Sequence, residues 1–158
     1  MKPGWRNGSA RRSGGFTLIE MIAVIVLIAI VLTVSSLSLS KSLASAKVRA
    51  ASKDLVAALR YTRGQAIVSG EERKLELDVD KRSYQAPKRN VQELPKGLTL
   101  KLLTAASERT GSSTGAIRFF PDGSSTGGRV RLISGDHASD VEVAWLTGEV
   151  RLREGTQP

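Results

Sequence analysis

An apolar run near the N-terminus constrains this chain more than any other feature. Residues 16–34 read FTLIEMIAVIVLIAIVLTV, and the polar members of this run are Thr17, Glu20 and Thr33. As an α-helix the run would be about 28 Å long at ~1.5 Å per residue, close to the ~30 Å hydrocarbon core of a bilayer. The sequence therefore predicts a helix that is long enough to cross a membrane once.

Glu20 is the unusual residue of this run, because a carboxylate inside a bilayer is costly and such residues normally have a partner. Phe16 lies one helical turn earlier on the same face. A cut between Gly15 and Phe16 would create an α-amino cation that could pair with Glu20 of its own chain or of a neighbour, and the spacing leaves both open. The acid and the length of the run both argue against a cleaved secretory signal, despite an Ala-x-Ala-like site at 44–46.

The stretch RRSGGFTLIEMIAVIVLIAIV, residues 11–31, resembles the class III signal of type IV pilins and type II secretion pseudopilins. This resemblance implies that residues 1–15 are a leader, that a prepilin peptidase cuts after Gly15, and that Phe16 is then N-methylated. It also implies that Glu20 supports assembly by pairing with the N-terminus of an adjacent subunit. Basic residues flank the run in similar numbers, so the resemblance decides the orientation, with the leader in the cytoplasm and the remainder in the periplasm.

The helix is expected to continue beyond the run, because no proline occurs between Pro3 and Pro87. Small and apolar residues then recur at spacings of three and four, as in an amphipathic helix: Val48, Ala51, Leu55, Ala58, Leu59, Thr62 and Ala66. Ser69 and Gly70 supply an end signal. We therefore expect residues 16–40 to form the transmembrane and assembly half of one helix, and residues 41–69 to form its amphipathic half.

After Gly70 the apolar period changes to strict alternation, which is typical of strands. The alternating segments are RKLELDV, LTLKL, AIRFF, RVRLI, VEVAW and VRL, separated by turn signals such as Pro121-Asp122-Gly123. They predict an α+β fold in which an antiparallel sheet of six or seven short strands, within residues 70–158, packs on the helix at 48–66. Trp145 alternates with Val143 and is expected in the core, and residues 104–115 are expected to form a mobile loop.

The glycine-rich stretch FFPDGSSTGGRVRL, residues 119–132, is interpreted as a hairpin. A phosphate-binding loop is excluded because Arg129 and Val130 stand where that motif needs Lys and Ser or Thr. A calcium loop is excluded because Asp122 has no acidic residues at alternate positions. Together with the Leu-Thr-Gly turn at 146–148, the stretch resembles the GspH/FimT family of type IV pilin-like proteins, which agrees with the pilin-like fold expected above.

Catalysis finds little support in the sequence. The chain has no cysteine, and its one histidine, His137, lies between Asp136 and Asp140 without an activated nucleophile or a second imidazole. A loop histidine is the favoured interpretation. We therefore expect no enzyme activity, no cofactor and no metal site.

The function implied by the resemblance is that of a minor pseudopilin of a type II secretion system, near the tip of a periplasmic pseudopilus that drives export of folded proteins. Its expected partners are prepilin peptidase, the other minor and major pseudopilins, the inner membrane and secreted exoproteins. The alternative is a FimT-like minor type IV pilin in pilus assembly or DNA uptake. The alternation of Arg129 with Arg131 and of Arg151 with Arg153 is the feature that favours anion or nucleic-acid contact. The net charge of +9 adds little, because it falls to +5 once the four basic residues before the apolar run are removed.

Overall fold

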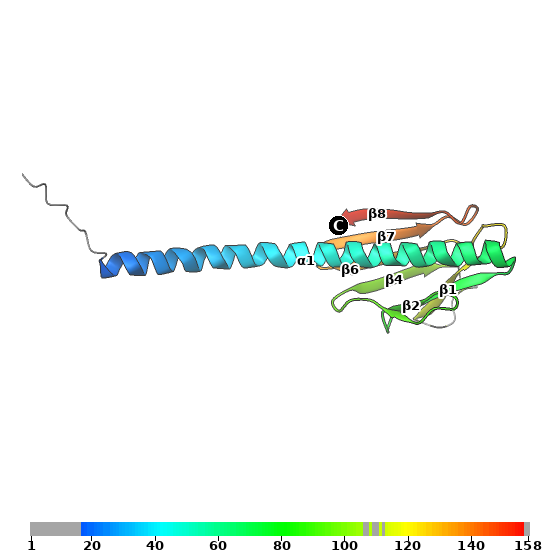
Figure 1. Ribbon diagram of the computed structural model, residues 1–158, viewed down its shortest axis with the longest axis horizontal. Coiled ribbons are helices and arrows are strands. Elements are labelled where there is room, and N and C mark those ends of the chain that lie inside the picture. The colour runs from blue at the N-terminus through cyan, green and yellow to red at the C-terminus, as the bar shows by residue number, and fades with distance from the viewer. Residues whose placement is uncertain (1–16, 106–107, 109–110, 112, 157–158) are drawn as a thin grey trace, which may run out of the picture. The chain divides into compact units, whose positions relative to one another are not determined.

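The computed structural model describes residues 17–105, 108, 111 and 113–156, leaving aside the side chains of residues 34–41 and 156. The chain divides into two compact units, Met1–Leu39 and Ser40–Pro158. The second unit contains the strands and the core (Figure 1).

Helix α1 spans Leu18–Ser69 and accounts for 52 residues. It ends where the sequence predicts, because Gly70 adopts a φ of 66°, a left-handed conformation that glycine reaches without steric cost. Within the second unit, every residue of the predicted apolar stripe is buried or half-buried, and Leu55, Leu59 and Thr62 are completely shielded from solvent. The spacing of three and four therefore produced the expected core-facing helix surface.

The strands that the structure describes form two four-stranded antiparallel sheets, where the sequence predicted one sheet of six or seven strands. The first sheet has the order β3-β2-β1-β5. Its strands are β1 (Arg73–Asp78), β2 (Ser83–Gln85), β3 (Gln92–Glu93) and β5 (Thr114–Phe119). The second sheet has the order β4-β6-β7-β8. Its strands are β4 (Thr99–Thr104), β6 (Gly128–Ser134), β7 (His137–Val143) and β8 (Val150–Thr156).

Both sheets turn an apolar face toward the second half of α1, which lies along them in Figure 1. The first sheet contributes Leu75, Leu77 and Ile117, and the second contributes Leu100, Leu132 and Val141, all essentially buried. The sheets approach each other closely at Gly115, where an added Cβ atom would lie 2.8 Å from Leu102 Cδ2. A larger residue at position 115 would require the Leu102 side chain to move.

Trp145 lies outside the core, so the prediction that it is a core residue is wrong. Its side chain is 68% exposed. The reason is that β7 ends at Val143 and the chain then turns: the Ala144 N–H donates to Glu149 O at 3.0 Å, and the Gly148 N–H donates to Ala144 O at 2.8 Å. The alternation that places Val141 and Val143 inside therefore stops before it reaches Trp145.

The segment at 104–115, expected to be a mobile loop, is anchored at one of its described residues. Glu108 is buried, and its Oε1 accepts a hydrogen bond from Arg118 Nε at 3.0 Å. Arg118, in β5, also donates to Glu72 at 2.7 Å. These two carboxylates, Glu72 first, raise the pKa of the Arg118 guanidinium.

Shortening a buried side chain at the helix–sheet contact should destabilise the fold. We expect Leu59→Ala to lower the free energy of unfolding by about 2–5 kcal/mol, because the shortened side chain leaves a cavity between α1 and the sheets. Leu43→Ala, on an exposed position of the same helix, is the matched control and should change it by less than about 0.5 kcal/mol. Urea unfolding followed by circular dichroism measures both, and equal effects would contradict the packing described.

Candidate interaction surfaces

Thr17 caps the first turn of α1. Thr17 Oγ1 accepts a hydrogen bond from the Glu20 backbone N–H at 3.3 Å, and the same N–H lies 3.1 Å from Thr17 O. A Thr followed three residues later by Glu, just before an apolar run, is a sequence signature of a helix start. The sequence analysis missed this cap, although the Thr-x-x-Glu spacing contains the signal. The negative charge of Glu20 is also favourable beside the free N–H groups of a helix N-terminus.

The surface of α1 on both sides of Glu20 is apolar and exposed throughout the described residues 18–32. Its large hydrophobic residues are each at least 43% exposed: Leu18, Ile19, Met21, Ile22, Val24, Ile25, Val26, Leu27, Ile28, Ile30, Val31 and Leu32. A helix that is apolar on all faces is stable when lipid or other helices surround it. Among the described residues, however, no helix meets the combined length and hydropathy of a membrane span. The predicted cleavage position, Gly15 and Phe16, lies outside the described residues.

The four arginines singled out from the sequence lie together on the outer face of the second sheet. The register aligns Arg129, Glu142 and Arg151 in one row across β6, β7 and β8, and Arg131, Asp140 and Arg153 in the next. Because side chains alternate along a strand, these residues face outward while Val130, Val141 and Leu152 face the core. The sequence could predict the outward direction of the arginines, but not which carboxylates lie beside them.

Each arginine of this outer face is ion-paired. Arg131 is bidentate to Asp140, with Nε–Oδ1 at 2.6 Å and Nη2–Oδ2 at 2.7 Å. Arg129 and Arg153 both reach Glu142, at 2.7 and 3.3 Å, and Arg151 reaches Glu149 at 2.8 Å. The side chains of Asp140 and Glu142 are 18% and 25% exposed, less than any of the four arginines. The carboxylates of β7 are therefore more shielded than the arginines beside them, whereas Glu149, at 52%, is as exposed as the arginines.

The hydrogen bonds from Arg131 hold the pKa of the Asp140 carboxyl below its ordinary value, and the positive charges of Arg131, Arg129 and Arg153 act in the same direction. The same pairing raises the pKa of Arg131. Asp140 is therefore a charge partner that stays ionised at neutral pH and not a proton donor.

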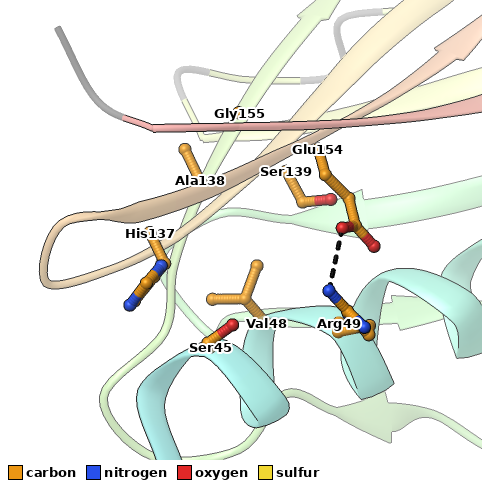
Figure 2. A pocket seen from close by; sticks show the side chains of 8 residues that line it. All are labelled: Ser45, Val48, Arg49, His137, Ala138, Ser139, Glu154 and Gly155. Carbon is orange, nitrogen blue, oxygen red and sulfur yellow. Dashed lines mark hydrogen bonds and ion pairs between the residues drawn. The ribbon is translucent and has the colours of Figure 1, made fainter. Parts of the chain in front are cut away.

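His137 is the first residue of β7, where the sequence favoured a loop position, and it lines a hollow of about 310 Å³ beside α1 (Figure 2). Arg49 of α1 and Glu154 of β8 close one side of this hollow with an ion pair of 3.0 Å. His137 and Asp140 have opposite parity in β7, so their side chains leave opposite faces of the sheet. His137 and Asp140 therefore do not form an acid–base pair. Within the described ranges, no group of three His, Cys, Asp or Glu residues is arranged to hold a metal ion.

Comparisons with known proteins agree on one family. Residues 51–147 match the family described as type II transport protein GspH, and residues 10–36 match the prokaryotic N-terminal methylation motif. The chain is 38% identical over 141 residues to type II secretion system protein H of Xanthomonas campestris pv. campestris. That alignment covers 89% of this chain and 83% of the relative.

Solved structures show the same fold. The minor pseudopilin EpsH from the type 2 secretion system of Vibrio cholerae matches with a TM-score of 0.54 and 19% identity, over 68% of this chain and 97% of EpsH. The type IV minor pilin FimU of Pseudomonas aeruginosa matches with a TM-score of 0.51 and 15% identity, over 67% of this chain and 87% of FimU. At these identities the likeness carries the fold alone.

The Asp140–Arg131 pair predicts how stability depends on pH. Because the folded-state pKa of Asp140 lies below the unfolded value of about 3.9, the pair stabilises the fold above about pH 4, and this contribution is lost as pH falls through the folded pKa. We expect Asp140→Asn to lower the melting temperature at pH 7 but to change it much less at pH 2. Asp80→Asn, in an exposed turn, is the control. A pH-independent effect of Asp140→Asn would contradict the charge pairing.

Proposed function

Because the chain belongs to the GspH family of type II transport proteins, we propose that it is a minor pseudopilin that assembles near the tip of a periplasmic pseudopilus. The observation that carries this proposal is the exposed apolar surface of residues 18–32, which contains Glu20 in the capped first turn of α1. Such a helix needs other helices or lipid around it. A subunit that moves from a membrane into a bundle of like helices has both environments in turn.

Processing would prepare this helix for assembly. We propose that prepilin peptidase removes residues 1–15 by cleavage between Gly15 and Phe16, and that the new terminus of Phe16 is N-methylated. The match to the methylation motif at 10–36 supports this order of events. Before assembly, residues 16–40 would anchor the chain in the inner membrane by a single pass. The amphipathic half at 41–69 and the β-rich domain at 70–158 would then lie in the periplasm.

Glu20 would couple one subunit to the next. The Thr17 cap accounts for the backbone N–H of Glu20, and the helix N-terminus favours its charge, but the contacts described give the carboxylate no ion-pair partner. We propose that the N-terminal amine of the adjacent subunit is that partner. Assembly with the other pseudopilins would then place the β-rich domain where a growing pseudopilus pushes folded exoproteins toward the outer membrane.

The alternative function, a FimT-like minor type IV pilin in pilus assembly or DNA uptake, rests on the outward-facing arginines. Arg129, Arg131, Arg151 and Arg153 are the residues that would contact phosphates. Their pairing with Asp140, Glu142 and Glu149 weakens this alternative, because part of each guanidinium's hydrogen-bonding capacity is already used and the carboxylates repel phosphate.

Removal of the proposed leader would make the mature chain smaller than the precursor. Gly15→Phe should block the peptidase sterically, so that the full-length precursor accumulates in cells that carry the complete secretion system. Gly14→Ala, one residue farther from the scissile bond, is the control and should be processed. An immunoblot against the C-terminal domain resolves precursor from mature chain, and normal processing of Gly15→Phe would refute the cleavage position.

The charge of Glu20 can be tested separately from its capping role. Glu20→Gln keeps a side chain that can complete a capping box but removes the charge. We therefore expect a stable, cleaved protein that recovers at least about tenfold less of the other pseudopilins in co-purification, a loss that corresponds to about 1.4 kcal/mol. Met21→Leu is the control. If Glu20→Gln assembles like the wild type, the carboxylate charge does not couple subunits.

A further inference from the structure

Two exposed apolar residues flank a hollow of about 640 Å³ on the outer side of the second sheet. Leu103, near the end of β4, lies on one side, and Trp145, in the turn after β7, lies on the other. Both side chains are 68% exposed, and Leu146 beside Trp145 is 67% exposed. Exposed large apolar residues that gather around a concavity mark an interaction site more often than scattered ones do.

Two glycines lie beside this hollow where a larger residue would not fit. An added Cβ atom on Gly127 would lie 3.1 Å from Trp145 Cβ, and one on Gly128 would lie 3.0 Å from Leu103 O and 3.3 Å from the buried Ile117. Both glycines also have positive φ angles, 72° and 153°, which other residues rarely adopt. Glycine at these two positions therefore lets the backbone pass close to Trp145 and Leu103.

The turn that carries Trp145 is held in place from the neighbouring loop. The Ser125 N–H donates to Trp145 O at 2.8 Å, and Ser125 Oγ donates to Ala144 O at 3.0 Å. At the C-terminal end of α1, Arg63 Nε donates to Gly123 O at 2.9 Å in the same loop. A partner that binds here would meet a preorganised surface, and less entropy would be lost in ordering it.

The outer face of the second sheet, beyond the hollow itself, has an excess of positive charge. It has five cationic side chains, Lys101, Arg129, Arg131, Arg151 and Arg153, against three carboxylates, Asp140, Glu142 and Glu149. The charged residues that line the hollow are balanced, with Arg129 and Arg151 against Glu142 and Glu149, so the excess comes from the rest of the face. Electrostatic complementarity with this wider face favours an acidic partner surface around the hollow.

We propose that the hollow between Leu103 and Trp145 receives an apolar side chain from an acidic surface of a neighbouring pseudopilin. The inference rests on the proposed function and names the surface by which this subunit contacts the next. Trp and Arg are typical of the residues that dominate protein–protein binding energy. A single-stranded nucleic acid would instead need a series of aromatic platforms, and this face offers one tryptophan.

The test uses the full-length chain with an affinity tag, produced in cells together with the other pseudopilins of its own system. We expect Trp145→Ala to recover those pseudopilins at least about tenfold less efficiently than the wild type does. Leu103→Glu, which places an acid at the rim of the hollow, should have the same effect. Val91→Ala, which changes another exposed apolar residue far from the hollow in sequence, should not. Thermal unfolding of each purified variant confirms that the fold is retained.

Charge is tested in the same assay. Arg151→Glu should reduce recovery of the pseudopilins, whereas Lys96→Glu, on an exposed turn outside this sheet face, should not. Wild-type recovery with no effect of Trp145→Ala or Leu103→Glu would overturn the docking surface and leave the proposed function intact. Failure of the wild type to recover any pseudopilin would overturn the proposed function itself. Binding of a DNA oligonucleotide that Trp145→Ala abolishes would replace the protein partner with nucleic acid and overturn the proposal.

Discussion

The packing of one helix surface against two sheets is the interaction on which the rest of this structure depends. Leu55 and Leu59 of α1 are completely buried among residues from both sheets, which share no strand. The described sheets also meet where Leu102 lies over Gly115. The apolar side chains of the long strands therefore face the helix. Because side chains alternate along a strand, the other side chains of these strands must face outward.

The inward direction of the apolar side chains determines which charged residues lie on the outer face. Val130 and Val141 must point inward, so Arg129, Arg131, Asp140 and Glu142 must point outward. The two carboxylates lie on β7, an interior strand, and therefore have arginines on both sides, whereas each arginine has a carboxylate on one side. This arrangement tolerates four closely spaced cations and still leaves an excess of positive charge. A slip of one residue in register would bury the charges and expose the valines.

Much of this fold could be predicted from the sequence, and the parts that could not have a common physical cause. The helix stripe from Val48 to Ala66 and the end at Gly70 depend on local spacing, and both are confirmed. The division into two sheets depends on β5 pairing with β1 across a separation of more than thirty residues, which alternation does not encode. Trp145 was misplaced because hydrogen bonds of Ala144 and Gly148 end the strand earlier than its apolar pattern does. The ion pairs of the arginines likewise depend on register between strands.

The proposed role of Glu20 in assembly follows from a comparison of two free energies, the stabilisation of its charge by the helix N-terminus and the cost of placing that charge in a membrane. The free N–H groups of the first turn of α1 stabilise a negative charge at position 20 by about 0.3–1 kcal/mol. An acidic side chain at the centre of a membrane helix costs about 2.5–3.5 kcal/mol, and less toward its end. The local contacts therefore offset only part of the cost that the proposed membrane position imposes. The remainder favours a second cation, and under the proposed processing the amine of Phe16 on an adjacent subunit is the group that can supply it. A lone helix would retain the penalty, so Glu20 would favour the assembled state over the isolated one.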